Sequence, residues 1–254
     1  MIHEQGYARV TELSEHFGIS EVTVRTDLDS LAANSTVQRV HGGAIAEGRA
    51  TQDQPHEHAF EQSMLAASGE KRRIGEAAAG LVESGQAIVL DVGTTTTAIA
   101  AALLARTELR DVVIITNALN IALALEPAIP NFTVIVTGGT LRPLQHSLVD
   151  PLAGTVLEHV RADIAFIGCS GVDALAGVTN VNLPEADAKR RMIATAARAI
   201  VVADSSKLGV SHLSRVAQLG EIDTLITGAE ASKDRVAALE AAGLTVVQSK
   251  PEQS

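Results

Sequence analysis

Two patterns of apolar and polar positions alternate along residues 70–254. Short continuous apolar runs, typical of strands buried on both faces, are separated by longer segments with apolar residues at helical spacing. Strands that alternate with helices form parallel sheets, because each helix returns the chain to the end where the next strand begins. The expected strands are residues 87–90, 112–116, 133–137, 164–168, 199–203, 224–227 and 244–247, and the expected helices are residues 95–104, 119–125, 151–159, 184–198 and 233–241.

One more helix is expected ahead of the first strand, between Glu70 and Gly85. With it, the whole segment predicts an α/β domain with a mainly parallel sheet covered by helices on both faces. The apolar stripe of this first helix is formed by Ile74, Ala77, Ala78 and Leu81.

The first 46 residues show a different pattern, with two short amphipathic helices. Val10, Leu13 and Phe17 share one face of the first helix. Thr11 can cap its start, and Gly18 can end it in the left-handed conformation. Ser20 can cap a second helix, residues 21–32, which buries Val24, Leu28 and Leu31 and leaves Thr23, Arg25 and Thr26 on another side.

Two helices joined by a short glycine-containing turn are typical of the helix-turn-helix, whose second helix enters the major groove of DNA. Residues 36–45 alternate and turn at Gly42-Gly43, as a two-stranded wing would. Residues 47–69 have little apolar periodicity and are interpreted as a linker. The expected domains are therefore a winged helix-turn-helix over residues 1–46, a linker over residues 47–69 and an α/β domain over residues 70–254.

Composition narrows the class of protein. The chain has 254 residues, 46% of them hydrophobic and 2% aromatic, so its core must be built from Ala, Val, Leu and Ile. Its single cysteine, Cys169, excludes an internal disulfide and suits a reducing cytosol. No apolar run approaches the roughly 20 residues of a membrane span, and we expect a cytoplasmic protein. His56 and His58 are interpreted as solvated linker residues, so we expect no metal and no cofactor.

The net charge of −10 opposes binding to nucleic acid. Residues 1–50 carry four basic and seven acidic side chains, so a DNA-binding module would have to gather its arginines on one face.

Hydroxyl and charged residues follow the ends of several expected strands. Asp91 ends one strand, and Gly93 with the threonines of residues 94–97 opens the next helix, where backbone N–H groups can bind a phosphate or carboxylate. Because parallel strands end at one edge of the sheet, these residues can share a cleft. The other candidates there are Thr116-Asn117, Gly138-Gly139, Gly168, Asp204 and Lys207.

Each of these residues also has a plainer interpretation. The glycine-threonine turn could be a capped helix start, and Asp91 could bind a sugar hydroxyl or merely cap the loop. Lys207 could bind the anion or pair with Asp204. Glu185 and Lys189 are four residues apart on one helix and could form an ordinary surface pair or face the cleft.

Several motifs then occur in a fixed order along nearly the whole chain. They are Val10-Thr11-Glu12-Leu13, Ile19 to Leu28, Arg39-Val40-His41-Gly42-Gly43-Ala44, Glu70-Lys71, Asp91-Val92-Gly93-Thr94-Thr95, Thr116-Asn117, Gly138-Gly139 and Asp204-Ser205-Ser206-Lys207. In these motifs the chain resembles the DeoR family of bacterial transcriptional regulators. The resemblance implies a winged helix-turn-helix joined to a sensor domain that is similar to sugar-phosphate isomerases and binds a phosphorylated sugar or related metabolite.

Two departures from the family pattern bear on DNA binding. The first helix of the family is longer, so the winged unit of this chain is expected to be truncated there, with the apolar faces around Leu13 and Leu28 less covered. Thr26 stands where the family more often has a basic residue, which removes one phosphate contact.

The expected function is a DNA-binding transcriptional regulator, a homo-oligomeric repressor of carbohydrate metabolism genes controlled by a phosphorylated sugar, and not an enzyme. Residues expected to contact the double-stranded operator are Ser20, Thr23, Arg25, Thr26, Arg39 and His41. Residues expected to contact the effector are Asp91, Gly93, Thr94, Thr95, Thr96, Asn117, Gly138, Gly139, Glu185, Lys189 and Lys207.

Two other functions stay open. One is a sugar-phosphate isomerase-like enzyme that uses Asp91, Asp173 or Glu185 as general base. The other is a metabolite-binding protein with impaired DNA binding, which the acidic N-terminal module favours.

Overall fold

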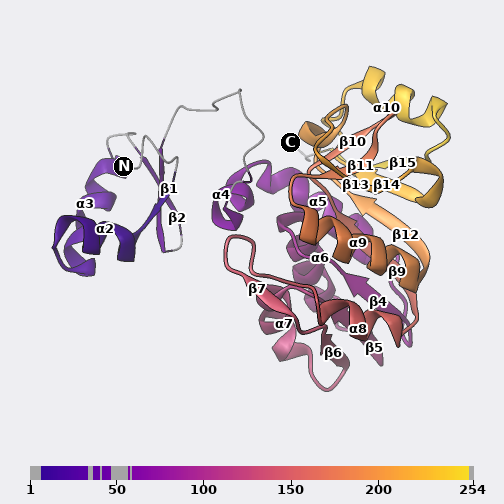
Figure 1. Ribbon diagram of the computed structural model, residues 1–254, viewed down its shortest axis with the longest axis horizontal. Coiled ribbons are helices and arrows are strands. Elements are labelled where there is room, and N and C mark those ends of the chain that lie inside the picture. The colour runs from indigo at the N-terminus through magenta and orange to yellow at the C-terminus, as the bar shows by residue number, and fades with distance from the viewer. Residues whose placement is uncertain (1–6, 34–36, 41, 47–56, 58, 252–254) are drawn as a thin grey trace. The chain divides into compact units, whose positions relative to one another are not determined.

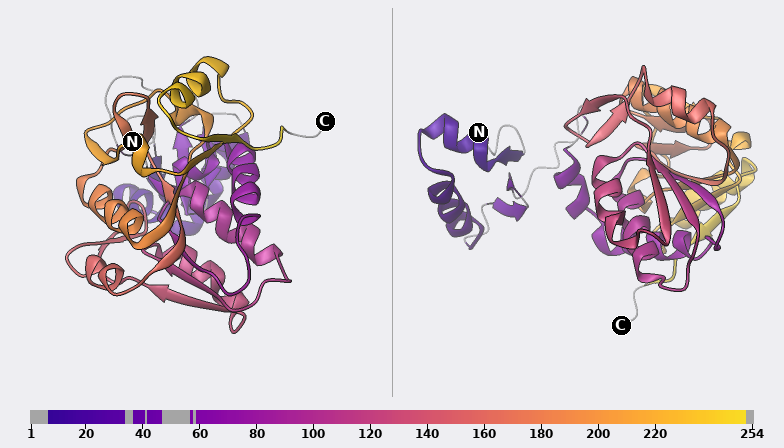
Figure 2. Two further views of the ribbon diagram at one scale, coloured as in Figure 1. Left: turned by 90° about the vertical axis from the view of Figure 1, so that its right-hand side faces the viewer. Right: turned by 90° about the horizontal axis from the view of Figure 1, so that it is seen from below.

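The computed structural model describes residues 7–33, 37–40, 42–46, 57 and 59–251. The chain divides into two compact units, Met1–Ala66 and Ala67–Ser254. Figure 1 and Figure 2 show the ribbon diagram of the chain from three directions.

Up to Ala46, the described part of unit 1 contains two helices and a three-stranded antiparallel sheet of order β1-β3-β2. The strand that precedes the first helix was not predicted, whereas the helices and the two wing strands lie where the sequence places them. Its elements are β1 (Tyr7–Arg9), α2 (Val10–Phe17), α3 (Glu21–Ala33), β2 (Val37–Val40) and β3 (Gly43–Ala46).

The caps of the two helices explain the turn between them. Gly18 ends α2 in the left-handed conformation at φ 64°, as expected. The Ser20 hydroxyl accepts a hydrogen bond from Thr23 N at 3.2 Å and so caps α3. The prediction for Thr11 is wrong, because α2 begins one residue earlier and Arg9 occupies the cap position.

A small core holds unit 1 together. Leu13 and Leu28 are only 4% and 2% exposed, because β1 and the wing cover them. The expectation of poorly covered faces at these two residues is therefore wrong. Phe17 and Leu31, also expected in the core, are exposed instead. The buried residues are Ala8, Val10, Leu13, Val24, Leu28, Val37 and Ala44.

A short helix, α4 (Phe60–Leu65), lies within the stretch interpreted as a linker. It is anchored by the buried side chain of Phe60. The second unit begins with α5 (Ser68–Ala79), two residues before the expected boundary at residue 70.

Unit 2 is built on a seven-stranded sheet of order β15-β14-β12-β9-β4-β5-β6, with every neighbouring pair parallel. All seven predicted strands are in it, which confirms the α/β class. Their bounds are β4 (Ala87–Leu90), β5 (Val112–Thr116), β6 (Phe132–Val136), β9 (Ala162–Gly168), β12 (Ala196–Val202), β14 (Thr224–Thr227) and β15 (Val246–Gln248).

Helices cover both faces of this sheet (Figure 1). Alternate strand residues such as Ile88 and Val89 belong to different apolar clusters, because successive side chains point to opposite faces. One cluster includes residues of α5, α6 (Thr94–Ala105) and α7 (Leu119–Leu125), and the other includes residues of α8 (Ala153–Glu158), α9 (Leu183–Thr195) and α10 (Lys233–Ala241).

Smaller elements were missed in the sequence, and some helices were predicted too long. The helix expected up to Gly85 ends at Ala79, so Leu81, expected on its apolar stripe, lies beyond it and is exposed. The helix expected over residues 184–198 ends at Thr195, and the next three residues begin β12 because they pair with β9. A hairpin of β7 (Thr140–Arg142) and β8 (Ser147–Val149) was not predicted, nor was a second sheet of β10 (Gly171–Asp173), β11 (Gly177–Asn180) and β13 (Ser214–Ala217).

Three single-turn 3-10 helices complete the described elements: η1 (Glu126–Ala128), η2 (Ser205–Lys207) and η3 (Leu219–Glu221). No helix in the part of the chain that the structure describes is long and apolar enough to cross a membrane. The same residues contain no group of three or more His, Cys, Asp and Glu side chains that could hold a metal ion.

Candidate functional site

The loops that follow five neighbouring strands carry most of the candidate effector residues. In the order β12-β9-β4-β5-β6 these loops contain Lys207, Cys169, Gly93, Asn117 and Gly138. Adjacent strands lie about 4.8 Å apart, so the loops after β12 and β4, on either side of β9, start roughly 10 Å apart. This places the turn that carries Lys207 and the turn that carries Gly93 at the same edge of the sheet.

Helix α6 begins at this edge without a side-chain cap and without an acidic residue in its first turn. Gly93, at φ 147°, precedes it, and Thr97 N donates to Gly93 O, so the backbone N–H groups of residues 94–96 come before the first intrahelical bond. The hydroxyls of Thr96 and Thr97 donate to Gly93 O at 2.9 and 2.7 Å. The backbone donors and the hydroxyls of Thr94 and Thr95 are the groups suited to an anion.

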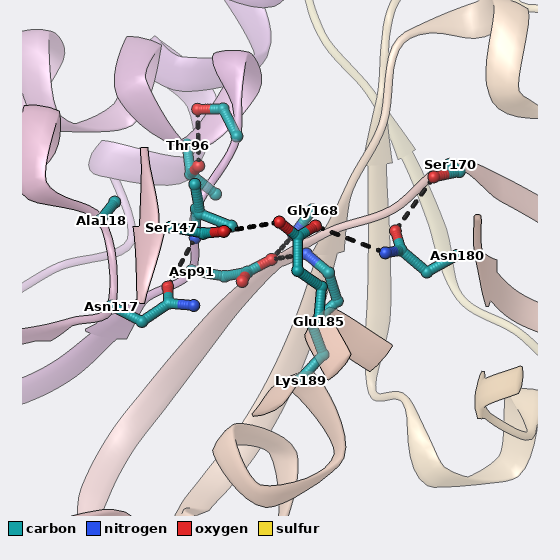
Figure 3. A network of polar contacts seen from close by, with 12 residues as sticks. Asp91, Thr96, Asn117, Ala118, Ser147, Gly168, Ser170, Asn180, Glu185 and Lys189 are labelled. Carbon is teal, nitrogen blue, oxygen red and sulfur yellow. Dashed lines mark hydrogen bonds and ion pairs between the residues drawn. The ribbon is translucent and has the colours of Figure 1, made fainter. Parts of the chain in front are cut away.

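Asp91 and Lys189 form a fully buried ion pair beside this helix start (Figure 3). The Asp91 carboxylate also accepts a hydrogen bond from Gly168 N at 2.9 Å through the same oxygen, Oδ2. Within the described part of the chain its other oxygen, Oδ1, is buried with no hydrogen-bond partner. A hydroxyl group brought by a ligand would give Oδ1 the donor it lacks.

The protonation of this pair is set by burial. Burial raises the pKa of Asp91 to about 6, although the ammonium of Lys189 opposes the rise. Burial would by itself lower the pKa of Lys189, but the carboxylates of Asp91 and Glu185 raise it above its ordinary value. Lys189 is therefore a cation at neutral pH, held next to a carboxylate that is easily protonated.

Glu185 lies one turn before Lys189 on α9 and is itself only 5% exposed. Figure 3 shows its carboxylate between Ser147 of β8 and Asn180 of β11. The carboxylate accepts hydrogen bonds from Ser147 Oγ at 2.7 Å and from Asn180 Nδ2 at 3.5 Å. Arg142 of β7 donates to the same carboxylate. Glu185 and Lys189 are thus not a surface pair, and each binds residues from other elements.

The side chain of Asn117 links the loop after β5 to the loop after β4 and to strand β8. Its side chain accepts from Val92 N at 2.9 Å and donates to Leu148 O at 3.2 Å. Gly138 and Gly139 lead into the β7–β8 hairpin with φ of 71° and 118°, and a Cβ on Gly139 would lie 2.2 Å from Val149 O. Only glycine fits the second of these positions, so these residues fix where the hairpin crosses the strand ends.

Lys207 ends η2 and is partly exposed. Within the described residues its ammonium forms no ion pair, so the interpretation of Lys207 as a partner of Asp204 is not what the structure contains. The Asp204 carboxylate instead accepts from Ser206 N at 3.1 Å and lies 3.8 Å from the ammonium of Lys71. Lys189 of α9 and Lys207 both act electrostatically on the thiol of Cys169.

Cys169 is an unreactive thiol at this position. Burial raises its pKa to about 12, so the nucleophilic thiolate is not populated at neutral pH. Asp173, considered as a general base, instead accepts hydrogen bonds from Leu175 N and Ala176 N, both at 2.9 Å, and these bonds lower its pKa. It therefore stabilises the turn between β10 and β11.

In unit 1 the residues expected to contact DNA lie on the exposed part of α3. Thr23, Arg25 and Thr26 are exposed. The Arg25 guanidinium pairs with the Glu21 carboxylate one turn earlier at 2.8 Å, and both side chains are about half exposed. Thr26 Oγ1 donates back to Val22 O at 3.0 Å.

Two further candidates are Arg39 and His41. Arg39 is a residue of β2, paired with Ala44 of β3, but its side chain is outside what the structure describes. His41 lies outside the described residues.

Sequence reasoning missed several polar residues at the strand ends. They come from short hairpins or from α5, and only the folded topology brings them to Asp91, Glu185 or the Lys207 turn. The exposed Val22 on α3 was also missed, because a lone apolar residue in a helix is usually expected to be buried. The missed polar residues are Arg142, Ser147, Ser170 and Asn180, whereas Glu70 and Lys71 were named as a family motif but not as site residues.

Comparison with known proteins bears on both units. The protein-family model described as the DeoR C terminal sensor domain matches residues 66–229, and the family model described as the DeoR-like helix-turn-helix domain matches residues 1–49. The HTH-type transcriptional regulator GlpR of Haloferax volcanii is 34% identical over 238 residues, which are 94% of this chain and 90% of that protein.

Two further relatives are named as repressors. The putative aga operon transcriptional repressor of Escherichia coli O157:H7 is 34% identical over 246 residues, 97% of this chain and 89% of the relative. The glycerol-3-phosphate regulon repressor of Escherichia coli K12 is 31% identical over 229 residues, 90% of this chain and 87% of the relative.

Proposed function

This chain belongs to the DeoR family of transcriptional regulators, and on that premise we propose that it is a DNA-binding repressor of carbohydrate metabolism genes that is controlled by a phosphorylated sugar or related metabolite. Unit 1 reads the operator and unit 2 binds the effector. The proposal implies a cytoplasmic protein without enzymatic activity, because the operator is chromosomal DNA and the bound metabolite serves as a signal.

One observation carries the effector part of the proposal. The uncapped start of α6 and the buried, unpartnered Oδ1 of Asp91 lie on the same loop, so one small molecule can offer an anion to the first and a hydroxyl to the second. Lys189, Arg142 and Lys207 bring positive charge to the same edge of the sheet, beside the carboxylates of Asp91, Glu185 and Asp204. A sugar phosphate has both of the required groups.

The phosphoryl group would bind the N–H groups and hydroxyls of Thr94 and Thr95, with Lys207 as the nearby cation. Hydrogen bonds to a charged group contribute about 1.5–3 kcal/mol each, so a few of them suffice for micromolar affinity. The sugar hydroxyls would bind Asp91 Oδ1 and the Glu185 carboxylate, and Gly138 and Gly139 would let the hairpin approach.

The operator part rests on the exposed residues of α3. Arg25 would exchange Glu21 for a base edge or a phosphate in the major groove, with Thr23 and Thr26 beside it. Val22, which is 70% exposed on the same helix, suits contact with a thymine methyl group. Ser20, Arg39 and His41 would contact the DNA backbone or the minor groove.

A symmetric homo-oligomer fits this function, because operators with repeated half-sites are read by symmetric assemblies. Sedimentation of the full chain with and without operator DNA would measure the assembly. A monomer that binds a single half-site would contradict this part of the proposal.

A thermal-shift screen of the full chain tests effector binding, because a ligand that binds only the folded state raises its apparent stability. Glycerol 3-phosphate comes first, since one relative is named for it, and ribose 5-phosphate and galactosamine 6-phosphate follow. Each phosphate is matched by its unphosphorylated parent. The expected result is a shift for at least one phosphate and none for its parent, whereas equal shifts for both members of every pair would contradict a phosphate site.

A turnover assay on each phosphate that binds separates a sensor from an isomerase-like enzyme. The expected result is binding without conversion. An operator titration with the DNA upstream of this gene separates a repressor from a metabolite-binding protein that has lost DNA affinity. Binding to that DNA no tighter than to unrelated DNA of equal length would contradict the repressor function.

A further inference from the structure

The first turn of α5 carries charged side chains that are buried against the loops at the effector edge. Glu70 and Lys71 are 7% and 6% exposed, although they follow the unit boundary by only a few residues. Buried charges destabilise a fold unless they are paired and hydrogen-bonded. Their partners therefore indicate what this helix start does.

Glu70 binds the turn that carries Lys207. Its carboxylate accepts from Ser205 N at 2.6 Å and from Ser205 Oγ at 3.1 Å. Burial raises the pKa of Glu70, while the two hydrogen bonds from Ser205 oppose the rise. A carboxylate with two bonds to one residue fixes both the backbone and the hydroxyl of that residue.

Lys71 contacts the residue that caps the same turn. Its ammonium lies 3.8 Å from the Asp204 carboxylate, which in turn caps η2 by accepting from Ser206 N. Lys71 and Lys207 repel each other electrostatically, since each is a cation acting on the other's surroundings. The contacts from Glu70 and Lys71 thus hold residues 204–205, at the start of the Lys207 turn, against α5.

The loop after β14 shows that this contact depends on shape. A Cβ on Gly228 would lie 2.0 Å from Glu70 Oε1, so only glycine leaves room for the Glu70 carboxylate. Arg73, one turn further along α5, pairs with Glu230 of the same loop. The start of α5 is thus fastened to the ends of two adjacent strands, β12 and β14.

We propose that Glu70 and Lys71 are positioning residues of the effector site, which hold the Ser205–Lys207 turn so that Lys207 can bind the phosphoryl group. Through these two residues, effector binding changes the first turn of α5, which directly follows the linker. The inference rests on the proposed effector function. The resulting route within unit 2 runs from the phosphoryl group to Lys207, from the turn of Lys207 to Glu70, and from Glu70 to helix α5.

A double-mutant cycle on the full chain tests this route. The probes are glycerol 3-phosphate and inorganic phosphate, and the variants are Glu70→Gln, Lys207→Ala and their combination. Glu70→Gln keeps the size of the side chain but replaces the acceptor of the Ser205 hydroxyl bond, and we expect about tenfold weaker phosphate binding by calorimetry. In the Lys207→Ala background the same change is expected to have no further effect. Losses that add would overturn the inference.

A second variant guards against loss of folding. Gly228→Ala keeps Glu70 but displaces its carboxylate, and it is expected to weaken phosphate binding as Glu70→Gln does. The matched control is Glu76→Gln on the same helix, where Glu76 pairs with Arg72 and both side chains are more than half exposed. This control is expected to bind phosphate as the wild type does.

Hydrogen exchange of residues 68–74 reports on the linker side of the route. In the wild type and in Glu76→Gln, phosphate is expected to slow exchange there, and in Glu70→Gln it is expected not to. If Glu70→Gln binds phosphate as the wild type does while Lys207→Ala binds it more weakly, this inference is overturned but the proposed effector function is not. Phosphates that fail to bind the wild type at all would overturn the proposed effector function together with it.

Discussion

The two units hold their key cations in opposite ways. In α3 the Arg25–Glu21 pair is about half exposed, whereas in unit 2 the Lys189–Asp91 pair is 3% and 0% exposed. An exposed pair contributes at most about 1 kcal/mol and can exchange its partner at little cost. A buried pair is difficult to break, because each ion left alone is desolvated. The first arrangement suits a surface that binds and releases DNA, and the second suits a preformed site that selects a ligand.

Removing one partner of the buried pair is expected to have the largest effect. Lys189→Met leaves the Asp91 carboxylate buried without its cation, and we expect a loss of about 3–5 kcal/mol in the free energy of unfolding. Urea unfolding measures it. The double variant Asp91→Asn with Lys189→Met is expected to recover most of the loss, and a single variant that loses less than about 1 kcal/mol would remove the contrast between the two pairs.

The buried pair is also expected to make the free energy of unfolding depend on pH. The pKa of Asp91 is raised from 3.8 to about 6 in the folded protein, a difference equivalent to about 3 kcal/mol. Because the folded state binds this proton more tightly than the unfolded chain, the contribution of Asp91 to stability is highest below pH 4 and falls as the pH rises to about 6.

Urea unfolding of the wild type and of Asp91→Asn at several values between pH 4 and pH 6.5 measures this contribution. The stability of the wild type relative to the variant is expected to fall over that range. A constant difference between the two proteins would show that Asp91 titrates in the folded state as it does in the unfolded chain.

The exposed pair is expected to matter for DNA rather than for stability. Arg25→Ala is expected to weaken operator binding by about 1–3 kcal/mol and to change the free energy of unfolding by less than about 0.5 kcal/mol. Glu21→Gln frees the guanidinium and is expected to strengthen operator binding. Fluorescence anisotropy with labelled operator measures both, and equal affinities for the two variants would contradict the role of Arg25.

The smallest effect concerns the turn that orients α3. Gly18→Ala places a side chain at φ 64° with no atom within 4 Å of the new Cβ, so only backbone strain of about 1–2 kcal/mol opposes it. Gly18→Asn, which tolerates this conformation better, is expected to lose less. Thermal unfolding of the full chain compares them, and an alanine variant as stable as the wild type would contradict the strain.

The sequence predicts the frame of unit 2 better than its site. Buried parallel strands are continuous apolar runs with sharp ends, so β4, β5 and β14 begin and end where expected. Residues 196–198 have a helical pattern, but pairing with β9 places them in β12. The helical propensity of these residues is overridden by their pairing with β9, a tertiary contact that no short window of sequence contains.

The same limit applies to the site residues. The loop from Asp91 to Thr96 is recognisable because its residues are adjacent in the chain. Arg142 is not, because it meets Glu185 only through the β7–β8 hairpin. The spacing of Glu185 and Lys189 favours a surface pair, and only the fold shows that this side of α9 faces buried carboxylates and amides.

The Arg25–Glu21 pair has a consequence for behaviour at different ionic strengths. An arginine that leaves a carboxylate for a DNA phosphate displaces a counterion from the DNA, while the abandoned carboxylate takes one up from solution. The two exchanges offset each other, so this contact adds little to the slope of log affinity against log salt. A DNA-binding protein whose arginine is already paired with a carboxylate is therefore expected to keep a nearly constant affinity for its operator when the salt concentration in the cell changes.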